Sequence, residues 1–179
     1  MVIVPHFDAV KWIEVNMQGG QDLTPEAIEA VTNFTLMWNL FEGLVCDNRA
    51  NVGTFEAFAG RVDFTRPPLN RFEQFDKCLS FWKSRYCTPA GFNDRFQGLN
   101  LRDNDRPKLV KEVLEDKNVD EKSKLLACMI IVYRLRNNLF HGIKTLMMLN
   151  DQVSNLNTAS QCIGSILKLT RSDLVRRAG

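Results

Sequence analysis

An arginine and a histidine stand five positions apart in residues 136–142, which read RNNLFHG. Histidine takes up and gives up a proton near neutral pH, so His141 is suited to general acid–base chemistry. Arginine is always charged and presents a fork of N–H donors, so Arg136 is suited to the oxygens of a phosphate. Asn137 and Asn138 follow the arginine and add amide groups. The types and spacing of these residues point to proton transfer beside a stabilised negative charge, and no other segment of the sequence combines such groups.

The helix that must position this segment is the most hydrophobic in the chain. Residues 125–133 (LLACMIIVY) are nine apolar residues in a row, a pattern typical of a helix that is buried nearly all round. Steps of four, three and four lead from Leu125 through Met129 and Val132 to Arg136, which predicts that the guanidinium lies on the buried face. An unpaired charge there costs several kcal/mol, so Arg136 requires a partner, a wet cleft or a ligand.

The spacing of Arg136 and His141 limits how both can reach one site. On an ideal helix, a separation of five residues rotates two side chains about 140° apart. The helix must therefore loosen or end between them, and Gly142 allows this. Glu42, in the first long helix, is a candidate to orient Arg136. The alternatives are a structural Arg136–Glu42 ion pair, a solvated Glu42, and a His141 that serves only in the core or as a helix cap.

Helical patterns cover most of the chain. Thr24 as N-cap and Pro25 at the first helical position predict a helix over residues 25–46, with an apolar stripe along it. Further helices are expected over 67–86, 107–116, about 120–140, and 151–175, the last as one helix or two. Residues 10–15 fit either a short strand or a helical turn. Residues 47–68 indicate a loop with one short helix, and residues 88–106 a long irregular excursion.

These elements predict an all-α protein, an up-and-down bundle of four main helices with short extra helices. We expect one domain over residues 1–179, with an N-terminal extension over 1–22 and the bundle over 24–175.

Composition argues against a membrane-spanning protein, a disulfide-bonded protein and a zinc site. The net charge of +2 does not indicate nucleic-acid binding by the chain as a whole. The longest apolar run is too short to span a membrane. The five cysteines form no CxxC pair and lie near no histidine, so we expect a reduced, cytoplasmic protein with neither disulfides nor zinc.

The segment YRLRNNLFHG (residues 133–142) resembles the motif of HEPN domains, in which four to six residues separate an arginine from a histidine and a polar residue often follows the arginine. Here Arg136, Asn137 and His141 occupy those places. The stretch MWNLFEG (residues 37–43), which contains Glu42, is more loosely similar to the first helix of that family, with its aromatic residues and glutamate.

The resemblance implies a four-helix bundle that dimerises with its motifs facing each other. It implies a metal-independent RNA endonuclease of a toxin–antitoxin, phage-defence or RNA-processing system, without a cofactor. Arg136, His141 and Asn137 would be its catalytic residues, with support from Glu42 and Asn138. Its partners would be RNA, a second copy of the chain and an antitoxin or regulatory protein. The alternative is a non-catalytic HEPN module that binds a nucleotide or a protein.

Overall fold

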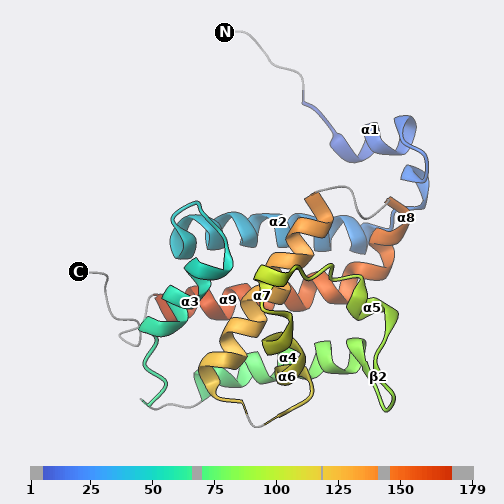
Figure 1. Cartoon of the computed structure of the whole chain (residues 1–179). Helices are drawn as coiled ribbons and strands as arrows, with labels where there is room; N and C mark the ends of the chain where they lie inside the picture. The colour runs from blue at the N-terminus through green and yellow to red at the C-terminus, as the bar shows by residue number, and fades with distance from the viewer. Residues whose placement is uncertain (1–5, 66–69, 118, 141–145, 171–179) are drawn as a thin grey trace, which may run out of the picture.

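The chain is almost entirely helical in a computed structural model (Figure 1), which describes residues 6–65, 70–117, 119–140 and 146–170. The long helices are α2 (Pro25–Cys46), α4 (Asn70–Tyr86), α7 (Glu121–Phe140) and α9 (Val153–Thr170). The shorter ones are α1 (Ala9–Asn16), α3 (Val52–Arg61), α5 (Asp94–Gln97), α6 (Pro107–Leu114) and α8 (Leu146–Leu149), with single turns η1 (Gly20–Asp22), η2 (Asp103–Asp105) and η3 (Asn150–Gln152). The prediction of an all-α protein is confirmed.

Helix α2 begins and ends where its residue types dictate. The Thr24 Oγ1 accepts a hydrogen bond of 3.2 Å from the backbone N–H of Ala27, and Pro25 occupies the first helical position. The helix ends at Cys46 because Asp47 adopts a left-handed conformation, with φ 48°. The predicted bounds of 25–46 are those of the structure.

Helix α7 runs through the middle of the fold, as its composition predicts. It packs against α3, α4, α6 and α9, while α2 lies along α9 (Figure 1). Every residue from 125 to 132 is buried, which confirms the expectation of a helix covered nearly all round. None of the described helices is long and apolar enough to cross a membrane.

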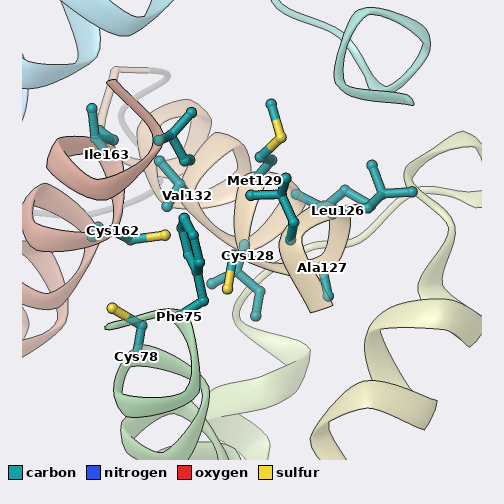
Figure 2. Close-up of a cluster of buried hydrophobic side chains, with 14 of the residues drawn as sticks. Phe75, Cys78, Leu126, Ala127, Cys128, Met129, Val132, Cys162 and Ile163 are labelled. Atoms are coloured by element: carbon teal, nitrogen blue, oxygen red, sulfur yellow. The ribbon is translucent and has the colours of Figure 1, made fainter. Parts of the chain in front are cut away.

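Three cysteines meet in this core, one each from α4, α7 and α9. Figure 2 shows Cys78, Cys128 and Cys162 gathered around Phe75. Burial raises the pKa of the Cys162 thiol well above its ordinary value, and a contact with Cys162 together with burial raises the pKa of Cys78. These thiols are therefore neutral and behave as small apolar groups. All five cysteines of the chain are free.

Short regular elements form in two segments, residues 10–15, which fit either a strand or a helical turn, and residues 88–106, expected to be irregular. Residues 10–15 are helical as part of α1, because Asp8 caps the helix by accepting from the backbone N–H of Lys11 at 3.0 Å. The excursion over 88–106 contains α5, η2 and most of a β-hairpin. The hairpin has two strands of two residues each, β1 (Cys87–Thr88) and β2 (Gly91–Phe92). Its residues 98–105 matter most here, because they lie against the end of α7.

Candidate functional site

Arg136 lies four residues before the end of α7 and is held by aromatic rings. Its Cζ is 5.5 Å from the centroid of the Trp38 ring on α2 and 5.2 Å from that of Phe140. The Nη1 donates a 3.1 Å hydrogen bond to the Oδ1 of Asn137, and the buried Nε has no hydrogen-bond partner in the described structure. Cation–π contacts thus position the guanidinium and leave its charge in place.

Glu42 reaches Arg136 only through Trp38. The indole Nε1 of Trp38 donates a 2.9 Å hydrogen bond to the Oε2 of Glu42, one turn along α2. Within the described ranges, no carboxylate forms an ion pair with Arg136. The alternative of a direct ion pair between Arg136 and Glu42 is therefore wrong. Glu42 instead holds the ring on which the guanidinium rests.

Among the arginines whose burial the structure describes, the fully buried one is Arg134. It is 2% exposed, and its Nη1 lies 3.3 Å from the Oδ2 of Asp105, which is 3% exposed. The Nε of Arg134 donates to the carbonyl oxygen of Leu99 at 3.1 Å, and Asp105 also accepts from the backbone N–H of Arg102 at 2.9 Å. Burial lowers the pKa of Arg134, while the charge of Asp105 opposes that shift.

The placement of Arg136 on the buried face therefore needs correction, because Arg136 is only half-buried. The apolar run surrounds the whole helix, so a second stripe, through Ala127 and Ile130, leads equally well to Arg134. Hydrophobic spacing alone could not choose between the two arginines. Asp105, in the excursion after α5, gave no sequence signal as the partner.

The two asparagines of the motif have different surroundings. Asn137 is buried and directs its Oδ1 to Arg136. Asn138 lies near Arg134, where its Nδ2 donates to the carbonyl oxygens of Gly98 at 2.9 Å and Leu99 at 3.3 Å. Its Oδ1 accepts from the Nδ2 of Asn100 at 3.3 Å. Asn138 therefore fastens α7 to the excursion, whereas Asn137 belongs with Arg136.

His141 lies outside the described residues. Phe140, directly before it, ends α7 with half of its surface exposed. The structure thus brings Arg136 and Asn137 together, links Glu42 to them through Trp38, and places Asn138 against another segment. Trp38 is a core residue, with 3% of its surface exposed. Its additional contact with Arg136 depends on how α2 and α7 pack, and only the four-residue spacing to Glu42 hinted at a role.

A polar cavity of about 250 Å³ lies on the Asn138 side of α7. Asn155 in its wall already accepts from the Nε1 of Trp82 at 3.0 Å and donates to Gln152 at 3.0 Å. Arg85 at its edge donates to the carbonyl oxygen of Asp151 at 3.2 Å and keeps one buried Nε without a partner. Since most of its polar groups serve the fold, this cavity is a weaker candidate site than the surroundings of Arg136.

In the described part of the chain, no group of three or more His, Cys, Asp or Glu side chains is placed so that it could hold a metal ion. The chemistry available at the end of α7 is that of a cation, an amide and an exposed aromatic ring next to a histidine in the sequence. In comparisons with known proteins, no family, no curated protein and no solved structure matches this chain.

Proposed function

We propose that the protein is a metal-independent RNA endonuclease of the HEPN type, active as a homodimer. The observation that carries the proposal is the guanidinium of Arg136, which no described carboxylate neutralises although one of its nitrogens is buried. A structural arginine is normally paired with an acid, as Arg134 is with Asp105. The charge of Arg136 is instead supported by rings, which leaves it free for a phosphate.

The proposed reaction uses the 2′-hydroxyl of RNA as the nucleophile. A base removes the proton of the 2′-OH, the 2′ oxygen attacks phosphorus, and the bond from phosphorus to the 5′ oxygen breaks. An acid protonates that leaving oxygen, so the products carry a 2′,3′-cyclic phosphate and a 5′-hydroxyl. His141 supplies the proton transfers, and Arg136 stabilises the negative charge that develops on the phosphate.

The dimer follows from the number of histidines. The chain has two, and only His141 belongs to the motif, so each chain supplies one histidine to the proposed site. A two-fold axis beside the end of α7 would bring two copies of His141 and Arg136 into one cleft. In this proposal the four long helices form the HEPN bundle, and α7 carries the motif to the dimer interface. The cellular setting is toxin–antitoxin, phage-defence or RNA processing, with control by an antitoxin or regulatory protein.

Cleavage is expected to proceed in EDTA and to leave a 2′,3′-cyclic phosphate and a 5′-hydroxyl. DNA, and RNA with a 2′-O-methyl group at the cut, should resist, because both lack the attacking hydroxyl. The rate should fall as salt rises, since the named binding group is cationic. Gel analysis of an end-labelled RNA, with and without phosphatase treatment of its ends, measures all of these properties.

A strict requirement for magnesium, or efficient cutting of DNA, would contradict this mechanism. Binding of RNA with no cleavage under any of these conditions would instead favour a non-catalytic module. A chain that neither binds nor cuts RNA would exclude both functions.

We expect a two-fold dimer at micromolar concentration, with the ends of the two α7 helices close together. Light scattering gives the mass in solution, and spin labels on a cysteine introduced at Phe140 give the distance between the two helix ends. A stable monomer with full activity would contradict the composite cleft. So would a dimer in which the two labels lie far apart.

A further inference from the structure

We infer that Phe140 is a stacking surface for a nucleobase of single-stranded RNA, beside the phosphate that Arg136 holds. The inference rests on the proposed function and names a binding position within that site. Phe140 is 50% exposed, although α7 is otherwise the most deeply buried helix. An exposed aromatic ring beside a cation offers both groups that bind a nucleotide: a π face for the base and a positive charge for the phosphate.

A chain of contacts leads from the core to this ring. Glu42 holds the indole of Trp38 at 2.9 Å, Arg136 lies over Trp38 at 5.5 Å, and Phe140 lies 5.2 Å from Arg136. Trp38 also stacks on Tyr133 with ring centroids 6.2 Å apart, so the inner end of the series is fixed. The outer end is Phe140, and part of its ring has no neighbour in the described structure.

The chemistry around Phe140 favours a base over a protein side chain. Among the other large exposed apolar residues, Leu36, Leu40 and Leu44 form an aliphatic stripe along α2. Such a stripe fits a protein surface. Phe140, in contrast, touches a guanidinium that no described carboxylate neutralises, and that charge would oppose a purely apolar partner. An anionic ligand with a flat ring satisfies both groups.

The position also predicts a preference among bases. Stacking strength rises with the area of the overlapping rings, so a purine should bind more tightly than a pyrimidine next to the cleaved phosphate. Because stacking accepts any π face, the preference should be graded and not absolute.

The test measures stacking directly and separately from cleavage. RNA oligonucleotides that carry 2′-O-methyl groups and a single 2-aminopurine are bound to the full chain, and the fluorescence of the 2-aminopurine is followed. At one position of the oligonucleotide, the wild type should quench this fluorescence. Phe140→Ala should abolish the quenching and weaken binding about fivefold or more. Phe140→Trp keeps an aromatic ring, so the quenching and the binding should both remain as in the wild type. Phe7→Ala removes another exposed phenylalanine and is the matched control, with no expected change.

Cleavage of unmodified RNA completes the test. Phe140→Ala should raise KM about fivefold or more, with a smaller change in kcat, and should flatten the purine preference. If Arg136→Ala stops cleavage but Phe140→Ala leaves KM and quenching unchanged, the stacking position is wrong and the nuclease stands. If quenching depends on Phe140 but RNA is never cut, the binding position stands and the nuclease fails. A Phe140→Ala protein that becomes monomeric without losing quenching would identify a dimer contact and overturn the inference.

Discussion

Replacement of either Arg136 or His141 by alanine is expected to lower the rate of RNA cleavage at least about a hundredfold. His141→Ala removes the proposed proton shuttle, and general acid–base groups contribute about 10²- to 10⁴-fold to enzyme rates. Arg136→Ala removes the cation that stabilises the phosphate in the transition state, an effect of similar size. Single-turnover cleavage of a labelled RNA measures both losses.

The control variants separate chemistry from folding. Arg49 is an exposed arginine beyond the end of α2, and Arg49→Ala should cut at the wild-type rate. Arg136→Lys keeps the charge but loses the planar fork and its stacking, so part of the activity should remain. Circular dichroism should show unchanged helical content in all these variants. Wild-type activity in Arg136→Ala or His141→Ala would place the chemistry elsewhere, and unfolding of either variant would indicate a structural role.

The substitution Asp105→Ala is expected to lower the free energy of unfolding by about 3–5 kcal/mol. The variant would leave the guanidinium of Arg134 buried, with a single hydrogen bond to the carbonyl oxygen of Leu99. A loss of this size is a large part of the stability of an ordinary domain. Urea denaturation followed by circular dichroism measures it.

Two further variants test whether the uncompensated charge is the cause. Asp105→Asn keeps an oxygen that can accept from the backbone N–H of Arg102, so its loss should be smaller than that of Asp105→Ala. Adding Arg134→Met to Asp105→Ala removes the stranded charge and should recover much of the stability, because apolar groups often replace a buried ion pair at little cost. Equal stability of Asp105→Ala and the wild type would mean that water reaches Arg134.

Local signals predicted the elements well. Thr24 and Pro25 fixed the start of α2, because a cap and a first-turn proline act within three residues. Nine consecutive apolar residues predicted that α7 is buried all round. The one short helix expected within residues 47–68 is α3, whose N-cap is Asn51, whereas the hairpin was not predicted.

In the candidate site, too, contacts between neighbours in the sequence were easier to predict than contacts between distant segments. The sequence placed both Asn137 and Asn138 with Arg136, and of the two only Asn137 bonds to it, because consecutive residues on a helix point in different directions. Trp38 lies almost a hundred positions earlier and touches Arg136 only because of how α2 and α7 pack. The partner of Arg134 was equally hidden, because Asp105 reaches the core from an irregular segment whose path no periodicity describes.

The hydrogen bonds from Arg134 and Asn138 to residues 98–99 affect how α7 is oriented about its own axis. Arg134 and Asn138 are four residues apart and therefore on one face, and both bond to the carbonyl oxygen of Leu99. Two hydrogen bonds on one face of α7 resist rotation of the helix about its axis. They therefore set the direction in which the side chain of Arg136 points. If residues 98–105 detached from α7, the end of the helix could rotate and Arg136 would point in another direction. Activity would then be lost through residues that never touch a substrate.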